Sequence, residues 1–541
     1  MILYRDAHWL AVDKPTGLAT HAPRPGELGA VEWLELHLGL ATHIVSRLDR
    51  GTSGVLLLAL DPAASARAER IHRADAATKT YEFVTTADAR ELGLGDDWRC
   101  DEPLDGKPAT TSFRRLGALP PGSRLAQDPG SGLHPGQPLF RYEAVLARGR
   151  QHQIRRHAAA AGLPLLGDAE HGGTPWPRLC LHCREVAWPE IAAPLRAPLP
   201  PSLQALADGA ADTALALALC RDRRGAWLEP VTDARRLVAR DEIAGLPAAV
   251  DLYGRWLNAV WYGEEMDGHE TDDAARVKAE LRPWLDRLAA ENDCPGGVIR
   301  IHQRNPHRRA LVADSVVVGQ PPPETFLVSE HDLRFEINLT RTQHTGLFLD
   351  QRDSRRRIAR LARGARMANL FAFTCSFAVA AAAQAAEVVF SVDVAKACLA
   401  TGKRNFAAND LTGAGSGKFI QEDARKWLRR QLRRQREGRD DRPLDLVVCD
   451  PPVFASSRDG GRFAVRDEWA FLAATVARLL APAGTALFAN NHRAGDPARY
   501  RRLLAEHFAS VTTLPPPLDF PTPAGRPPHV HTFLCTHPRR P

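Results

Sequence analysis

The chain has 541 residues, of which 44% are hydrophobic and 25% charged. That length exceeds what one core supports, so two or three folded units are expected, and the composition excludes bulk disorder. The 71 basic and 64 acidic residues give a net charge of +7, which favours a polyanionic partner such as nucleic acid.

Cysteine usage and the first residues predict a cytoplasmic protein. Nine cysteines are scattered singly, and the opening MILYRD has neither a basic start nor an apolar signal core. The longest apolar run, 377–390, is interrupted and too short for a bilayer, so no membrane span is expected. Cys180 and Cys183 form a lone CxxC without a second ligand pair. We therefore expect a buried strand pair there and no metal.

Proline clusters divide the chain into three predicted domains. They lie at 188–201 and 319–323, and they suggest domains at 1–200, 205–325 and 326–541. The first has short β-rich runs such as TKTYEFVT and predicts an α+β fold. The second mixes strands with a helix and predicts a small α+β domain. The third alternates helices with the apolar strand-like runs MANLFAFT, EVVFSVD, PLDLVVCD and GTALFAN, which predicts a Rossmann-like α/β domain.

A charged cluster lies just before an apolar strand in VSRLDRGTSGVLLLAL, residues 45–60. Taken alone, Asp49 between Arg47 and Arg50 is more readily explained by a local ion pair than by a catalytic site. Three further segments accompany it in the first domain: ILYRDAHWLAVDKPTGL (2–18), Lys79-Thr80-Tyr81 followed by DEPLDGKPATTSF, and GRQHQIRRH (149–157) leading to LPLLGD.

Together these segments, over about 1–190, resemble the RluA-type pseudouridine synthases. The resemblance implies that Asp49 is the catalytic carboxylate, which attacks the uridine ribose or removes a proton from it. It implies that Arg155 pairs with Asp49, that Tyr81 packs under the base and accepts a proton, and that Arg47 fills the space of the extruded nucleotide. No cofactor is implied. Ser46 and Gln151 depart from the family pattern of His and Thr.

Two arginine-rich runs occur in the last domain, at 351–366 and 429–442. Either run is suited to phosphate binding by counterion release, and either equally fits a solvated helix face.

The third domain contains a nucleoside-binding pattern. In MANLFAFTCSFAVAAA an apolar strand leads through small residues into a helix, and Asp393 ends the next strand, 20 residues after Phe373. Backbone amides there would face a cofactor while the acid binds ribose hydroxyls. Dinucleotide binding is the competing interpretation, but GxGxxG is absent.

The segment VVCDPPVF at 447–454 places an acid and two prolines at a strand end. Such a rigid turn presents Asp450 and backbone carbonyls to a base amino group, and Phe454 stacks on the ring. A simple strand-ending turn is the alternative. With QHTGLFLDQRDSRR (343–356) and QEDARKWL (421–428), this segment resembles the class I methyltransferases of large-subunit ribosomal RNA, over about 208–541.

This second resemblance implies S-adenosylmethionine as cofactor and RNA as partner. The implied cofactor contacts are Phe348, Asp350, Arg352, Phe373, Thr374, Asp393 and Asp423. Asp450 and Phe454 would act in catalysis, and Pro451, Pro452, Asn490 and Asn491 would contact the base. The family has Gly where Cys375 stands, and Gly permits close backbone approach, so a weakened cofactor site is expected.

The segment LFANNHR at 487–493 indicates which atom is methylated. Relatives that methylate cytosine C5 have a cysteine there, because that carbon needs covalent activation by a thiolate. Asn490-Asn491 instead resembles the branch that methylates guanine N7. The sequence thus predicts a bifunctional enzyme of large-subunit rRNA. The alternatives are cytosine C5 methylation and a catalytically decayed RNA-binding assembly factor.

Overall fold

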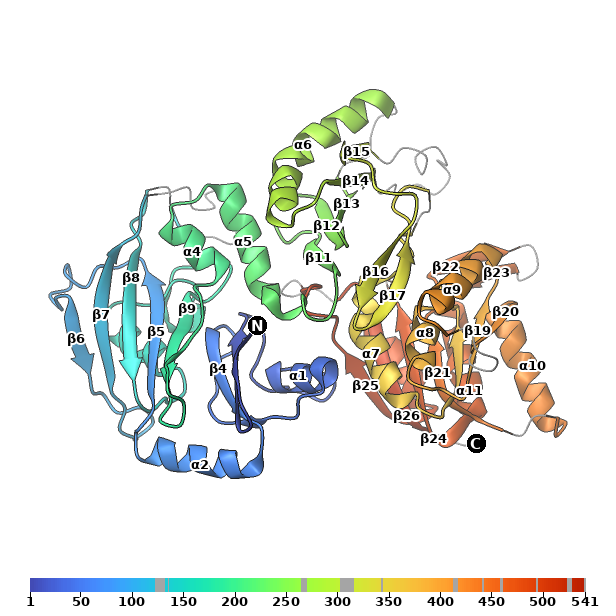
Figure 1. Cartoon of the computed structure of the whole chain (residues 1–541), viewed down its shortest axis with the longest axis horizontal. Coiled ribbons are helices and arrows are strands. Elements are labelled where there is room, and N and C mark those ends of the chain that lie inside the picture. Colours follow the sequence, from blue (N-terminus) through green and yellow to red (C-terminus); the bar gives the residue numbers. More distant parts are fainter. Residues whose placement is uncertain are drawn as a thin grey trace.

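A computed structural model describes residues 1–121, 132–134, 136–263, 270–301, 316–341, 344–411, 417–439, 442–457, 461–492, 495–522 and 528–539. Three sheet-centred regions follow one another along the chain, with the blue-to-teal N-terminal region and the yellow-to-red C-terminal region on opposite sides of the green middle region (Figure 1). Among the described helices, none is both long and apolar enough to cross a membrane.

The N-terminal region is a mixed sheet with helices, as the sequence predicted. The strand order is β1-β2-β4-β9-β5-β8-β7-β6, with β3 on β4 and β10 on β9. Its elements are β1 (Ile2–Arg5), β2 (Trp9–Lys14), α1 (Ala30–Leu38), β3 (His43–Ile44), β4 (Ser53–Ala59), α2 (Pro62–Arg73), β5 (Thr78–Thr85), β6 (Asp97–Cys100), β7 (Thr111–Ala118), β8 (Phe140–Leu146), α3 (Gln153–Ala160), η1 (Ala169–His171), β9 (Leu181–Ala187) and β10 (Leu195–Arg196).

Strands β4 and β9 form the parallel pair at the centre of this sheet. Gly54 permits it, because a Cβ there would lie 2.1 Å from the carbonyl oxygen of Cys183. Cys180 and Cys183 are both buried free thiols at or beside β9, which confirms the predicted buried strand pair.

The middle region is a small α+β unit around a five-stranded sheet of order β11-β12-β13-β14-β15. Strands β13 and β14 run parallel, and α6 makes the crossover between them. The elements are α4 (Pro201–Ala207), α5 (Asp212–Arg224), η2 (Gly225–Trp227), β11 (Ala234–Val238), β12 (Ala248–Tyr253), β13 (Trp256–Trp261), α6 (Glu270–Glu291), β14 (Gly296–Ile301) and β15 (Val316–Gly319). The separate hairpin β16 (Phe326–Glu330)–β17 (Leu333–Ile337) follows and packs on helices of the C-terminal region.

The C-terminal region is a doubly wound α/β sheet of order β20-β19-β18-β21-β24-β26-β25. Its first five strands are parallel, and β26 is antiparallel to both neighbours. The elements are η4 (Leu349–Gln351), α7 (Arg352–Leu361), β18 (Arg366–Leu370), α8 (Ser376–Ala382), β19 (Val388–Asp393), α9 (Lys396–Ala408), β20 (Gly417–Gln421), α10 (Ala424–Arg436), β21 (Leu444–Cys449), β22 (Phe454–Ser457), β23 (Gly461–Ala464), α11 (Val465–Leu479), β24 (Leu480–Asn490), α12 (Pro497–Ala505), β25 (Phe508–Leu514) and β26 (His531–Pro538).

The N-terminal and C-terminal regions also touch directly, where α1 packs on α7. Arg356 Nε donates to the Leu36 carbonyl at 3.0 Å, and Arg360 donates to the carbonyl of Glu35. In the same contact, His37 Nε2 lies 3.2 Å from a carboxylate oxygen of Asp353. Much of the first arginine-rich run is therefore an internal interface, so it fits neither of its two interpretations, a phosphate-binding face or a solvated helix face.

Candidate active sites

The N-terminal site is a cavity of about 500 Å³ beside the start of β4. It is lined by all four side chains predicted as catalytic in this region: Arg47, Asp49, Tyr81 and Arg155. They come from three separate segments, namely the loop before β4, strand β5 and helix α3. The fold thus brings together residues that the sequence motifs only suggested as a set.

The loop that carries Asp49 is fixed by the opening segment of the chain. Thr20 Oγ1 donates to the carbonyl oxygen of Leu48 at 2.9 Å and accepts from the Leu48 amide at 3.1 Å. Thr16 Oγ1 donates to the Gly51 carbonyl at 2.7 Å. These bonds on either side of Asp49 hold its backbone, so its carboxylate, 35% exposed, faces the cavity from a fixed position.

Arg155 lies between three carboxylates. Its Nη1 is 3.6 Å from Asp49 Oδ2, which agrees with the predicted pair. Its Nε and Nη2 donate to the fully buried Asp168 at 2.7 and 2.6 Å, and Nη2 also donates to Glu170 at 3.0 Å. Charge-assisted bonds of this length fix a guanidinium firmly. Asp168 is thus the main anchor of Arg155, a role the sequence motif did not reveal.

Tyr81 is a largely buried side chain in the cavity wall. Burial, followed by the neighbouring Cys183, raises the pKa of its hydroxyl well above 10, so the phenol stays protonated at neutral pH. A protonated phenol is a very weak base, so this environment disfavours the proton-acceptor role predicted for Tyr81. The buried ring is available to pack against a base.

Two lysines near Asp49 escaped the sequence analysis as individual residues. Lys14 is fully buried and donates to the carbonyls of Pro15 and Leu18 at 3.0 and 2.7 Å. Burial, reinforced by Arg178, lowers the pKa of Lys14 to about 7. Lys79 lines the cavity, and burial lowers its pKa too. The signal in the sequence was a lysine inside the apolar run LAVDKPTGL.

Apart from Asp49, the charged side chains that line the cavity are all basic. Arg73, Arg148 and Arg150 lie at its edge, as do the two departures from the family pattern, Ser46 and Gln151. A basic rim around an acid suits a polyanionic substrate, because the cations neutralise phosphates while the carboxylate reaches the sugar or base.

The C-terminal site lies at the carboxyl ends of the parallel strands, where β19 and β21 flank β18. Ligands of doubly wound sheets bind at this switch in strand order. Asp393, which ends β19, accepts from the Phe373 amide and the Ala395 amide, both at 2.8 Å. Burial raises the pKa of Asp393. The predicted loop and acid are thus directly bonded to each other.

The loop between β18 and α8 turns tightly through left-handed backbone at Phe371, Phe373 and Cys375, with φ of 55°, 48° and 63°. Cys375 is buried, and its thiol fits only because residue 402 is glycine: a Cβ at Gly402 would lie 2.4 Å from the Cys375 sulfur. The loop therefore accommodates Cys375 by packing, although a Cβ in left-handed backbone remains unfavourable.

Thr374, the remaining predicted loop residue, supports the loop rather than facing solvent. Its hydroxyl donates to the Gly346 carbonyl at 2.6 Å, and Asn405 Nδ2 donates to the Thr374 carbonyl at 3.0 Å. Because the side chain of Thr374 is buried, only its backbone is available to contact a ligand.

Aromatic and acidic side chains gather above this loop. Phe348 and Phe373 have ring centroids 5.2 Å apart, and His344, which the sequence analysis missed, lies 5.5 Å from Phe348. Burial, together with the charge of Asp350, raises the pKa of Asp450 to about 7; burial also raises the pKa of Asp350. Burying two negative charges near each other is unfavourable, so this pair of carboxylates favours a ligand that is cationic or donates a proton.

The two prolines after β21 differ in their exposure to solvent. Pro451 is buried, Pro452 is exposed, and Phe454 is 53% exposed with Arg462 above its ring. An exposed aromatic ring next to Asp450 fits the predicted stacking role.

Three other predicted residues differ in how available they are to a ligand. Asp423 caps α10 through the Arg425 amide at 2.8 Å and pairs with the Arg425 side chain at 2.9 Å. At the end of β24, Asn491 is exposed whereas Asn490 is completely buried. Asn490 therefore does not reach a base in this conformation, and that part of the prediction is corrected.

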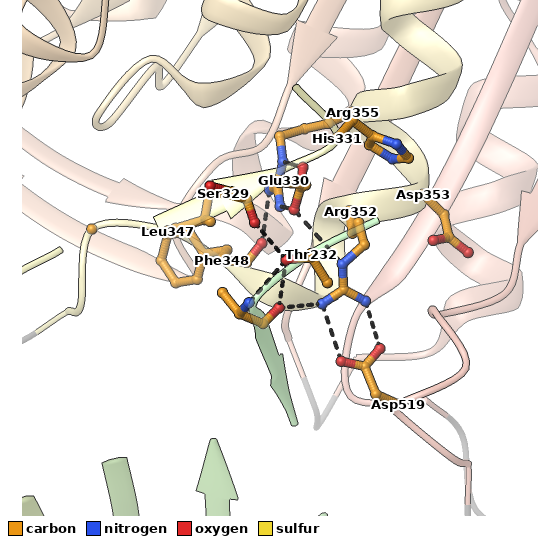
Figure 2. Close-up of polar contacts among 12 residues, drawn as sticks. Thr232, Ser329, Glu330, His331, Leu347, Phe348, Arg352, Asp353, Arg355 and Asp519 are labelled. Atoms are coloured by element: carbon orange, nitrogen blue, oxygen red, sulfur yellow. Dashed lines mark hydrogen bonds and ion pairs between the residues drawn. The ribbon is translucent and has the colours of Figure 1, made fainter. Parts of the chain in front are cut away.

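Arg352 is a second correction, because it is completely buried and makes structural contacts. Its guanidinium bonds both carboxylate oxygens of Asp519 at 2.8 and 3.1 Å, and Arg355 bonds Glu330 in the same way at 2.7 and 2.6 Å (Figure 2). The motif had suggested a cofactor contact, whereas the fold uses this arginine to join α7 to the segment before β26.

The chain has two separate catalytic domains. One is an α+β domain with an acid in a basic cavity, and the other is a doubly wound domain with a cluster of acids at its switch in strand order. Residues 8–160 match the family model described as RNA pseudouridylate synthase. Residues 284–525 match the model described as S-adenosylmethionine-dependent methyltransferase. The chain thus contains a pseudouridine synthase domain and a methyltransferase domain, and the cofactor of the latter is S-adenosylmethionine.

Among known proteins, the chain is similar to Ribosomal RNA large subunit methyltransferase K/L of Shewanella sp. (strain ANA-3), with 35% identity over 220 residues. The same-named protein of Shewanella oneidensis is 34% identical over 218 residues. Each match covers 39% of this chain, and the chain spans only 29% and 28% of these relatives. A solved structure of SMU.776 complexed with SAH shares the fold, with a TM-score of 0.50 and 23% identity over 59% of this chain and 80% of that one.

Proposed function

We propose that the chain is a bifunctional RNA-modifying enzyme that isomerises uridine to pseudouridine and methylates a base of large-subunit rRNA. The observation that carries the proposal is the pairing of the Asp49 cavity and the acid cluster around Asp450, in two domains that match modifying-enzyme families. We divide the chain at 1–200, 205–325 and 326–541, with the middle domain serving the methyltransferase.

In the synthase domain, Asp49 is the catalytic carboxylate. It either attacks the ribose or removes a proton from it, so that uracil detaches, rotates and rejoins through carbon. Arg155, held by Asp168, keeps a positive charge 3.6 Å from Asp49 Oδ2. Tyr81 packs under the base, and the exposed Arg47 takes the space that the flipped nucleotide leaves.

In the methyltransferase domain, the residues at the strand ends fit S-adenosylmethionine. Asp393 suits ribose hydroxyls, the Phe348 and Phe373 rings suit an apolar portion, and the acids Asp350 and Asp450 suit positive charge. When bound, the cofactor supplies an electrophilic methyl group. Asp450 and Phe454 orient the acceptor base so that the methyl transfers in line.

Guanine N7 is the proposed acceptor atom. It has its own lone pair, whereas cytosine C5 methylation requires an accessible thiolate. Burial raises the pKa of Cys375 to about 12 and holds that of Cys449 well above its usual range. With both thiols protonated, and with the exposed Asn491 rather than a cysteine just after β24, the site favours a nitrogen acceptor over C5.

Large-subunit rRNA is the proposed substrate because the relatives carry those words in their names and because arginines line the Asp49 cavity. Helix α10 exposes Arg429, Arg433 and Arg436. Cations on such a helix bind phosphates without reading sequence, and salt weakens that binding.

The proposal is tested by nucleoside mass spectrometry of rRNA from a deletion strain that expresses the native chain, Asp49→Ala or Asp450→Ala. We expect Asp49→Ala to lose pseudouridine and keep methylation, and Asp450→Ala to show the reverse. Loss of both modifications in Asp49→Ala would contradict independent sites. The assembly-factor alternative predicts that the native chain restores neither, and that calorimetric titration detects no S-adenosylmethionine binding at millimolar concentration.

A further inference from the structure

A cluster of two imidazoles and a carboxylate lies at the edge of the Asp49 cavity. His152 precedes α3 in left-handed backbone with φ of 52°, and Glu170 and His171 lie in η1. One potential ligand atom from each lies within 4.8 Å of the others. We propose that His152, Glu170 and His171 bind a divalent transition-metal ion such as Zn²⁺.

One distance within this trio equals the ligand–ligand spacing of a zinc site. Ligand atoms about 2.0–2.1 Å from a tetrahedral zinc lie roughly 3.4 Å from each other, and His152 Nδ1 is 3.4 Å from Glu170 Oε1. The two imidazole rings are nearly perpendicular, at 84°, with centroids 5.3 Å apart. Two imidazoles and one carboxylate form a ligand set that zinc, iron and nickel accept.

A second observation concerns the orientation of His171. Its Nδ1 lies 3.1 and 3.2 Å from the carboxylate oxygens of Asp168, whose side chain is fully buried. Donation from Nδ1 to that carboxylate leaves the lone pair on Nε2. Histidines that bind a metal through one ring nitrogen usually donate the N–H of the other ring nitrogen to a carboxylate, which fixes the orientation of the ring.

The charges around Arg155 also favour a cation here. Three carboxylates, those of Asp49, Asp168 and Glu170, lie 3.6, 2.6 and 3.0 Å from this one guanidinium. Neutral imidazoles add no positive charge, so the carboxylates outnumber the one guanidinium that they share, although Lys79, Arg148 and Arg150 also line the cavity. The competing arrangement is protonation of the histidines, with ion pairs in place of the metal.

No metal site was expected from the sequence, because it contains no second pair of metal ligands at a spacing along the chain that is typical of zinc sites. His152 and His171 are separated by 18 intervening residues, and only the fold brings η1 beside the start of α3. The proposed site depends on side chains of the synthase domain alone, so its test needs no enzymatic activity.

The test is Co²⁺ titration of the full chain after chelator treatment, followed by visible absorption and by competition with a chromophoric chelator. Co²⁺ bound through imidazole nitrogen absorbs in the visible region, and Zn²⁺ should displace it. We expect the native chain to bind one more Co²⁺ than His171→Gln. We also expect Glu170→Gln and His152→Gln to weaken that site at least about tenfold.

His21→Gln, a change at an exposed histidine elsewhere, is the matched control and should bind like the native chain. Thermal melting without metal checks that each variant is folded. Equal Co²⁺ stoichiometry and affinity in the native chain and a folded His171→Gln would overturn the proposal. So would the absence of any Co²⁺ absorption, which would favour protonated histidines instead.

Discussion

The buried pair of Arg352 and Asp519 gives the sharpest stability prediction. Both side chains are fully buried, and both carboxylate oxygens accept from the guanidinium (Figure 2). Asp519→Ala leaves Arg352 with only the Ala234 carbonyl at 2.8 Å and Glu330, which is 3.7 Å away and shared with Arg355. Stranding a buried charge costs about 3–5 kcal/mol.

We expect the lower end of that range, about 3 kcal/mol, because Glu330 still faces Arg352. The amide of Arg236, which donates to Asp519 at 2.9 Å, loses its acceptor as well, at a cost of about 1 kcal/mol. At about 2–4 °C per kcal/mol for a domain of this size, the melting temperature should fall by about 8–16 °C.

Differential scanning calorimetry of the methyltransferase transition measures this fall. Asp286→Ala is the matched control, because it breaks an ion pair of 2.6 Å with Arg282 that is more than half exposed and worth less than about 1 kcal/mol. The double variant Arg352→Met/Asp519→Leu should recover most of the loss, since apolar replacement of a buried pair is often neutral. A fall in Asp519→Ala no larger than in Asp286→Ala would refute the reasoning.

Three further changes test other parts of the structure. Burial and Asp350 raise the folded pKa of Asp450 to about 7, so folding takes up a proton and stability falls as pH rises from about 4 to 7. The melting temperature of cofactor-free Asp450→Asn should therefore fall less between pH 5 and 8 than that of the native chain. An equal fall would contradict this. Gly402→Ala should weaken S-adenosylmethionine binding in calorimetry, because the new Cβ would lie 2.4 Å from the Cys375 sulfur. Adding Cys375→Gly should restore binding, and a double variant that still binds weakly would exclude that clash as the cause. Zn²⁺ should inhibit pseudouridine formation at concentrations at least about tenfold lower in the native chain than in His171→Gln, and equal sensitivity would separate the metal from the activity.

Local motifs predicted the parts of the structure that are contiguous in sequence. The runs MANLFAFT, EVVFSVD, PLDLVVCD and GTALFAN correspond to β18, β19, β21 and β24, because apolar runs between helices define a parallel sheet. The strand-end acids follow from the same pattern, since parallel strands share one carboxyl edge. The sequence placed Phe373 and Asp393 at neighbouring strand ends, but it did not predict the hydrogen bond between them.

Tertiary partners could not be predicted in the same way. Asp168 holds Arg155, and Gly402 makes room for Cys375, yet no spacing rule joins either pair. Burial is similarly invisible in a motif. Nothing in FANNHR distinguishes the buried Asn490 from the exposed Asn491 except the alternation of a strand whose ends were unknown.

Helix α7 shows why an arginine-rich run is a weak guide to RNA binding. Arg352 and Arg355 point inward to buried acids, whereas Arg356 and Arg360 bond the carbonyls of the residues in α1. A guanidinium has five donors, so it satisfies carbonyls and carboxylates inside a protein as readily as phosphates outside. The run thus ties the two catalytic domains together. Phosphate contacts are better sought where arginines are exposed, on α10 and around the Asp49 cavity.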